Sequence, residues 1–230
     1  MLVTKPKRKF SPDTGNKEKS EVKRLSLFAV AVLALFASCL PTWAQLSEKT
    51  FDLAVNSKFV DCLGVPYGPQ PTATVTLQRG NLSDVLILTA HHLKPNLAFD
   101  LFTTQRTNLL ANGQADPAFT NFGLAWYQTD VEADSNGDAE VAIKTILIDQ
   151  IFGFDPAAGL PPTNTFHVGF WFNNPKDAAA CGFPVNQPTP FNGEHRAGPN
   201  AMMSLPDAQT NLGPLCTNPV VHGNSFVCNP

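Results

Sequence analysis

The sequence lacks the short motifs that identify several enzyme classes. It contains no Gly-x-Ser-x-Gly nucleophile elbow and no His-Glu-x-x-His zinc motif. Its five cysteines include no Cys-x-x-Cys pair, so they do not have the spacing of a structural zinc site. These absences favour a protein without catalytic function, although they leave the question of enzymatic activity open.

Basic residues are scarce once the first 44 positions are set aside. The chain has 16 Lys and Arg against 19 Asp and Glu, and residues 1–44 hold 8 of the bases but 3 of the acids. The rest of the chain therefore has 8 bases against 16 acids, a net charge of −8. Nucleic acids and anionic membrane surfaces are bound through basic patches, so neither is an expected partner.

The only long apolar run lies near the N-terminus. Basic residues at 5–9 and 23–24 precede the run Leu25–Leu40, which has 16 residues and is short for a membrane span of about 20. Small residues follow, ending at Ala44. This order is typical of an export signal, and we predict that residues 1–44 are removed by cleavage before Gln45.

Two other fates of this segment remain open. Phe36-Ala37-Ser38-Cys39 resembles a bacterial lipoprotein signal, in which Cys39 becomes the lipidated first residue. The segment can also stay uncleaved as an anchor. We predict a secreted, periplasmic or cell-envelope protein, with membrane attachment only through a lipid at Cys39.

Export places the remaining cysteines in an oxidising compartment, where thiols pair. Four are left, namely Cys62, Cys181, Cys216 and Cys228. An even number predicts two disulfides, and three pairings are possible. Proximity in the sequence favours Cys216 with Cys228, which leaves Cys62 to pair with Cys181.

Short segments rich in Val, Ile, Thr and Phe recur between turn signals and predict β-strands. The expected strands are 73–77, 84–93, 97–103, 122–131, 139–148, 165–173 and 201–205. The segment 84–93 is apolar on both faces, which predicts a central strand buried on two sides. In the strand 165–173, Phe166, Val168, Phe170 and Phe172 alternate with polar or small residues and so share one face.

No gap between these strands shows the long 3.6-residue periodicity that a parallel sheet requires. We therefore predict an all-β fold, an antiparallel β-sandwich of immunoglobulin-like architecture with long irregular C-terminal loops. The Cys…Trp…Cys spacing of true immunoglobulin domains is absent, so the prediction concerns architecture only. The expected organisation is the export signal 1–44, a sandwich core 45–183 and a loop-rich extension 184–230 packed on the same domain.

Histidines are the residues most suited to hold a metal in an exported sandwich. His91 and His92 are adjacent on a predicted strand and point to opposite faces. One of them, His92, can join His167 and His195 in a copper or zinc site. The alternative is that these side chains form structural hydrogen bonds, because no His-x-His spacing is present.

The acidic segment 130–138 superficially resembles a calcium loop, with oxygen ligands at alternate positions before Gly137. The glutamate expected at position twelve is replaced by Ile143. A hairpin turn at Asn136-Gly137 is the favoured interpretation. A weak calcium site near Asp134 is the alternative.

The second face of strand 165–173 carries His167, Gly169 and Trp171. A glycine between an imidazole and an indole leaves space above the sheet, so this face is a candidate ligand platform, with a sugar ring stacked on Trp171. In the alternative, a loop covers the face and buries Trp171. Glu194 and His195 form a polar cluster in a loop and complete the predicted ligand-binding residues.

Together these features predict a non-enzymatic β-sandwich that binds a ligand or a surface, or has a structural role. Its partner is predicted to be a small molecule, a glycan or a surface protein, without a cofactor. The alternative is a copper- or zinc-dependent extracytoplasmic enzyme that uses His92, His167 and His195.

Overall fold

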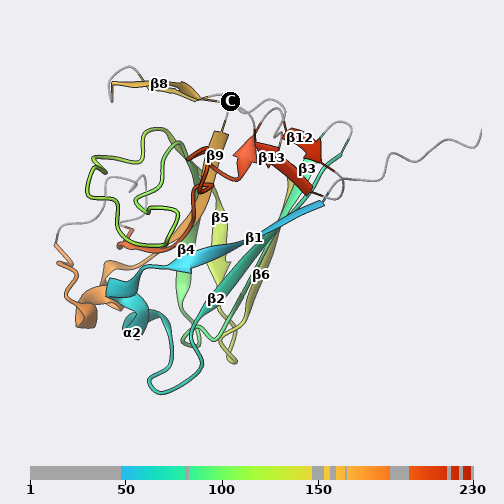
Figure 1. Cartoon of the computed structure of the whole chain (residues 1–230). Coiled ribbons are helices and arrows are strands. Elements are labelled where there is room, and N and C mark those ends of the chain that lie inside the picture. The colour runs from blue at the N-terminus through green and yellow to red at the C-terminus, as the bar shows by residue number, and fades with distance from the viewer. Residues whose placement is uncertain are drawn as a thin grey trace, which may run out of the picture. The chain divides into compact units, whose positions relative to one another are not determined.

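A computed structural model describes residues 48–80, 83–146, 153–155, 159–163, 165–186, 197–216, 219–222 and 225–228. The strands are β1 (Glu48–Val55), β2 (Thr72–Gln78), β3 (Asp84–His91), β4 (Ala98–Thr104), β5 (Ala125–Glu132), β6 (Ala139–Ile146), β7 (Gly153–Asp155), β8 (Leu160–Thr163), β9 (Thr165–Phe172), β10 (Asn200–Ser204), β11 (Leu215–Cys216), β12 (Pro219–His222) and β13 (Ser225–Cys228). Three short helical segments, η1 (Ser57–Phe59), α2 (Val60–Leu63) and η3 (Pro175–Cys181), complete the elements. The fold is therefore mainly β, as predicted (Figure 1).

Nine of the strands form one antiparallel sheet with the order β5-β4-β9-β10-β1-β2-β3-β6, and β11 adds to β9. The two strands at the ends of this order, β5 and β6, are joined by a tight turn and contact each other. The sheet is therefore nearly closed, as a barrel-like β-sandwich. Two small hairpins, β7-β8 and β12-β13, stand outside it.

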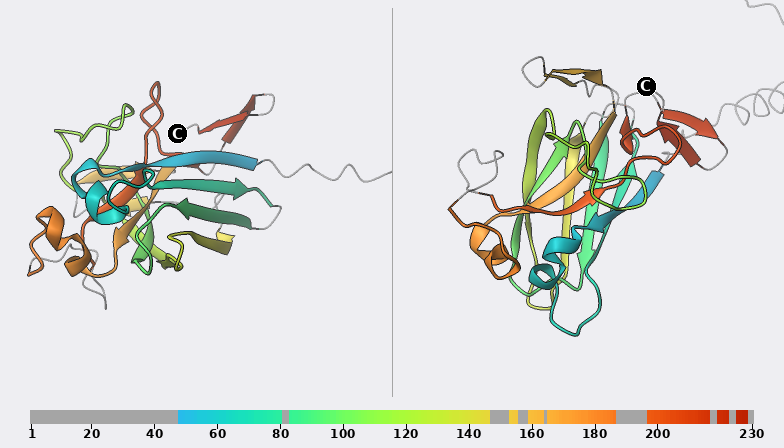
Figure 2. Two further views of the ribbon diagram at one scale, coloured as in Figure 1. Left: turned by 90° about the horizontal axis from the view of Figure 1, so that it is seen from below. Right: turned by 60° about the vertical axis from the view of Figure 1, so that its left-hand side comes forward.

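The two layers of this sandwich are halves of one sheet, whereas the sequence led us to expect two separate sheets. Strands β6, β3, β2 and β1 form one half, and β5, β4, β9 and β10 form the other. They meet where Leu53–Val55 of β1 pair with Met202–Ser204 of β10. We call this short stretch of pairing the β1–β10 seam. Figure 2 shows β1, in blue, running alongside β2, with which it pairs along most of its length.

The main core lies between the two halves. It contains Val75, Leu77, Leu86 and Leu88 from one half and Phe99, Leu101, Phe166, Val168, Phe170 and Phe172 from the other, each fully enclosed. Alternating residues of a strand point to opposite faces, so the apolar alternation in β2, β3, β4 and β9 produces this core directly. The predicted shared face of the four β9 residues is confirmed.

Strand β9 is buried on its other face as well. There a second apolar cluster gathers Phe102, Trp171 and Met203 beneath the long loop 105–124 that connects β4 to β5. This loop is drawn in green beside β9 in Figure 1. Every residue of β9 is consequently buried.

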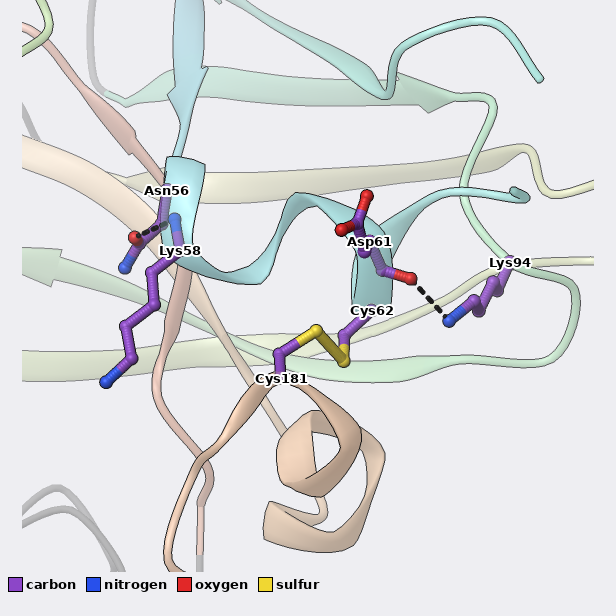
Figure 3. Close-up of a disulfide and its surroundings, with 6 residues drawn as sticks. All are labelled: Asn56, Lys58, Asp61, Cys62, Lys94 and Cys181. Atoms are coloured by element: carbon purple, nitrogen blue, oxygen red, sulfur yellow. Dashed lines mark hydrogen bonds between the residues drawn. A yellow bond between two sulfur atoms is a disulfide. The ribbon is translucent and has the colours of Figure 1, made fainter. Parts of the chain in front are cut away.

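A disulfide joins Cys62 of α2 to Cys181 of η3, with Cα atoms 6.1 Å apart (Figure 3). The predicted pairing of these two cysteines is confirmed. Nearby, the side chain of Asn56 accepts a hydrogen bond from the N–H of Lys58, and Lys94 Nζ donates to the carbonyl of Asp61 at 2.7 Å. Cys216 is also in a disulfide, but its partner lies outside the described side chains, so the pairing with Cys228 stays a prediction.

The structure also differs from the predicted strands. Strand β1 was not predicted, although it pairs with both β2 and β10. In β3 the residues alternate between buried and half-buried, so the prediction of burial on two sides is wrong for this strand. The C-terminal part contains β10, β11, β12 and β13 and is thus more regular than its Pro, Asn and Gly content suggested.

Candidate functional site

A cavity of about 400 Å³ opens on the second face of β9. Its walls come from the loop segment 105–116, from residues 163–167 at the start of β9, and from the loop 206–213 that follows β10. Cavities of this size are typical of small-molecule sites. It is the candidate functional site among the described residues.

His167 lies in the wall of this cavity and is 4 % exposed. Its Nδ1 is 3.1 Å from the hydroxyl of Ser204, which also accepts a hydrogen bond from the N–H of Val168 at 3.1 Å. Ser204 belongs to β10, the neighbour of β9. The imidazole is thus fixed by the pairing of two central strands.

Burial lowers the pKa of His167 to about 4, against a smaller opposing effect of hydrogen bonding with Ser204. The ring is therefore neutral near pH 7. The hydroxyl of Ser204 can donate to Nδ1 or accept from it, and the tautomer of the ring decides which of the two donates.

Nε2 of His167 has no hydrogen-bond partner among the described residues. It is also absent from the fully buried unpaired side-chain atoms there, which are Asn108 Oδ1 and Asn200 Oδ1. Nε2 is therefore not a fully buried unpaired atom, and the neutral ring is one of the polar groups that line the cavity. Ser204, in contrast, is fully buried behind the ring and does not reach the cavity as a nucleophile.

Two charged residues also line the cavity. Arg106 is half-buried, with its guanidinium 6.0 Å from the centroid of the Phe119 ring. Asp116 is half-buried too, and its Oδ1 accepts a hydrogen bond from the N–H of Ala118 at 2.8 Å. No ion pair joins Arg106 to Asp116, and neither pairs with another charged side chain in the described part of the chain.

The wall formed by residues 206–213 is held in place by side chains. Asp207 Oδ1 accepts hydrogen bonds from the N–H groups of Gln209 and Thr210 and from the hydroxyl of Thr210, and these bonds lower the pKa of Asp207. Lys49 Nζ of β1 donates to the carbonyl of Pro214 at 3.1 Å. Burial lowers the pKa of Lys49, and the nearby Asp207 opposes that effect. These contacts give the loop a defined shape.

Trp171 does not present its ring as an exposed platform. It is 1 % exposed, and its ring lies edge-on to Phe102 and Phe122 at 5.3 and 5.2 Å between centroids. In the alternative interpretation of the sequence, a loop covers this face of β9 and buries the ring of Trp171. Gly169 leaves space, but this space is occupied by the neighbouring strand, since an added Cβ would meet Met203 and the carbonyl oxygen of Met202.

The other predicted site residues are dispersed or lie outside the description. His92 follows β3 in a positive-φ conformation and is exposed, whereas His167 is buried in β9, which three strands separate from β3 in the sheet order. Glu194 and His195 lie outside the described residues. Within the described ranges, no group of three His, Cys, Asp or Glu side chains is arranged to hold a metal. The copper or zinc site is therefore untested as a whole.

The acidic segment 130–138 contains the predicted hairpin turn. Gly137 has a φ of +84°, and Asp134 Oδ1 accepts hydrogen bonds from the N–H groups of Asn136 and Asp138 at 2.7 and 3.0 Å. These backbone bonds lower the pKa of Asp134. The carboxylate thus stabilises its own turn, and the weak calcium site stays an untested prediction.

Sequence reasoning identified His167 but missed Arg106, Asp116 and the loop 206–213. The two charged residues belong to a loop without periodicity, and their convergence on β9 depends on contacts far along the chain. The only available signal was the length of segment 105–124 between two predicted strands, because long loops in small domains often carry function.

Comparison with family models, with curated proteins and with solved structures finds no match to this chain. The described part of the chain contains no helix long and apolar enough to cross a membrane.

Proposed function

We propose that this chain is an exported β-sandwich protein that binds a small polar molecule in the cavity on the second face of β9. The observation that carries the proposal is the cavity of about 400 Å³, whose wall includes the buried imidazole of His167 and the charged side chains of Arg106 and Asp116. A concave site lined by apolar residues and a few polar groups is the usual form of a small-molecule site.

The arrangement favours binding over catalysis. The hydroxyl beside the imidazole belongs to Ser204, which is fully buried and hydrogen-bonded to the backbone of β9. A nucleophile has to reach its substrate. Ser204 therefore acts as a structural support for the imidazole of His167.

Export and the immunoglobulin-like form of the sandwich belong to the proposal too. The basic and apolar leader supports export, and the Cys62–Cys181 disulfide is consistent with an oxidising compartment. Two antiparallel layers packed around one core support an immunoglobulin-like architecture.

The proposal is tested by thermal unfolding of the purified protein with sugars, amino acids, organic acids and nucleosides, each supplied separately. A ligand at about ten times its dissociation constant stabilises the folded state by about 1.4 kcal/mol, which raises the melting temperature by about 3–6 °C for a domain of this size. We expect at least one class to produce this shift.

A matched pair of variants locates the binding. Leu110 and Val185 are both 36 % exposed, but only Leu110 lines the cavity. Leu110→Trp is expected to fill the cavity and abolish the shift, whereas Val185→Trp retains it. Equal shifts in both variants, or no shift with any compound, would contradict the proposal.

A further inference from the structure

The charges in the cavity indicate the class of molecule that it binds. Arg106 and Asp116 line the same space, have opposite charge and form no ion pair with each other. When two such groups are left apart in a half-buried site, each remains available for a counter-charge on a ligand. A molecule with a cation and an anion satisfies both groups at once.

The rest of the wall favours a ligand with an apolar portion. Leu109, Leu110, Leu212 and Pro206 line the cavity, and the only ring system with π-electrons among the lining residues is the imidazole of His167. Sugar sites commonly use an aromatic face for stacking, and the ring that the sequence suggested for this role, Trp171, is buried. The lining therefore fits an aliphatic side chain better than a sugar ring.

We infer that the cavity binds a zwitterion, an α-amino acid with an aliphatic side chain, with the carboxylate toward Arg106 and the ammonium group toward Asp116. This inference rests on the proposed function and specifies its ligand class. His167 adds a neutral imidazole to the lining of the same cavity. Since the ring is neutral at neutral pH, the lining has one positive and one negative charge, and the ligand has the same balance.

The test uses L-leucine and two analogues that each lack one charge. 3-Methylbutylamine has no carboxylate, and 4-methylpentanoate has no ammonium group. Dissociation constants are measured by calorimetry on the purified protein. We expect leucine to bind about tenfold or more tightly than either analogue, because each analogue loses one charge-assisted contact.

Two substitutions assign the charges to their partners. Arg106→Gln is expected to weaken leucine and 4-methylpentanoate about tenfold and to leave 3-methylbutylamine unchanged. Asp116→Asn is expected to do the opposite, and its amide oxygen can still accept the N–H of Ala118. Lys58→Gln is the matched control, since Lys58 also rests over a phenyl ring, that of Phe59, but does not line the cavity.

The inference is overturned if leucine binds no more tightly than both analogues, or if the two substitutions weaken all three compounds equally. It is also overturned if leucine does not bind while another class gives the shift that Leu110→Trp abolishes. In that case the proposed function stands and only the ligand class is wrong. If no compound of any class binds, both fail.

Discussion

Gly169 shows how closely β9 and β10 pack. An added Cβ at this position would meet the sulfur of Met203 and would lie 2.8 Å from the carbonyl oxygen of Met202. We predict that Gly169→Ala lowers the free energy of unfolding by about 1–3 kcal/mol, the usual cost of overpacking. Urea denaturation measures the change.

A double-mutant cycle with Met203→Ala provides the control. Part of the cost of Gly169→Ala should disappear when the sulfur is removed, since residues in contact do not have additive effects. A cost of zero in both backgrounds would show that the strands separate easily at this point.

His167 makes stability depend on pH. Its pKa is about 4 in the folded protein and about 6.5 in an unfolded chain, so the unfolded state binds the proton more readily. Its stabilising contribution is complete above about pH 6.5 and is lost progressively as the pH falls toward 4, by about 3 kcal/mol in total. Denaturant midpoints across this pH range measure the loss.

Other groups, mainly carboxylates, also contribute to acid sensitivity, so the comparison is made with His167→Asn. This side chain retains a hydrogen-bonding atom for Ser204 but does not titrate. The stability difference between the variant and the native protein should decrease as the pH falls. A difference independent of pH would mean that folding does not lower the pKa of this imidazole.

Among the elements, α2 and η3 depend on each other most directly. Each is short, and the Cys62–Cys181 bond closes a loop with a sequence separation of 119 residues. Restriction of the unfolded chain by such a loop corresponds to about 5 kcal/mol in the chain-entropy model. We predict that the double variant Cys62→Ala, Cys181→Ala loses about 2–5 kcal/mol of stability, measured by thermal unfolding.

Treatment with a reductant separates the effect of the disulfide bond from the effect of removing the two cysteine side chains, of which Cys62 is buried and Cys181 half-buried. It should destabilise the native protein to about the level of the double variant, apart from the contribution of the Cys216 disulfide. If the reduced native protein keeps its full stability, the bond is not what holds α2 to η3.

Several elements could be predicted from the sequence because their residue pattern matches a strand that is buried on one face. The alternation in β2, β4 and β9 is of this kind, and it is set by local geometry. Strand β1 was missed because Lys49 and Asp52 interrupt its apolar residues. Its partners, β2 and β10, decide its conformation, and they come later in the chain.

The cavity was less predictable than the strands. His167 was identified because it lies within the clearest strand. Arg106 and Asp116 were not, since the course of loop 105–124 over β9 is set by packing of Phe122 on Trp171 and not by any local signal. The burial of Trp171 was one of two alternatives, and it was favoured because large aromatic side chains usually lie in the core.

At the scale of the whole molecule, one prediction concerns both the N-terminus of the mature chain and its disulfides. If export and cleavage proceed as proposed, the mature chain begins at Gln45 and contains two disulfides, Cys62–Cys181 and Cys216–Cys228. Mass spectrometry of the protein recovered after export is expected to show this N-terminus, and peptide mapping without reduction is expected to show both pairs. A lipidated Cys39, or a retained leader, would replace the cleavage that we predict.

The β1–β10 seam has a consequence for the order in which the chain folds. Residues 53–55 leave the ribosome long before residues 202–204, to which they pair. The meander of β1, β2 and β3 can form early from neighbouring strands, but it stays an open layer with its apolar side uncovered until the last large strand arrives. Closure therefore has to wait for β10, and pairing between residues so far apart in the sequence slows folding.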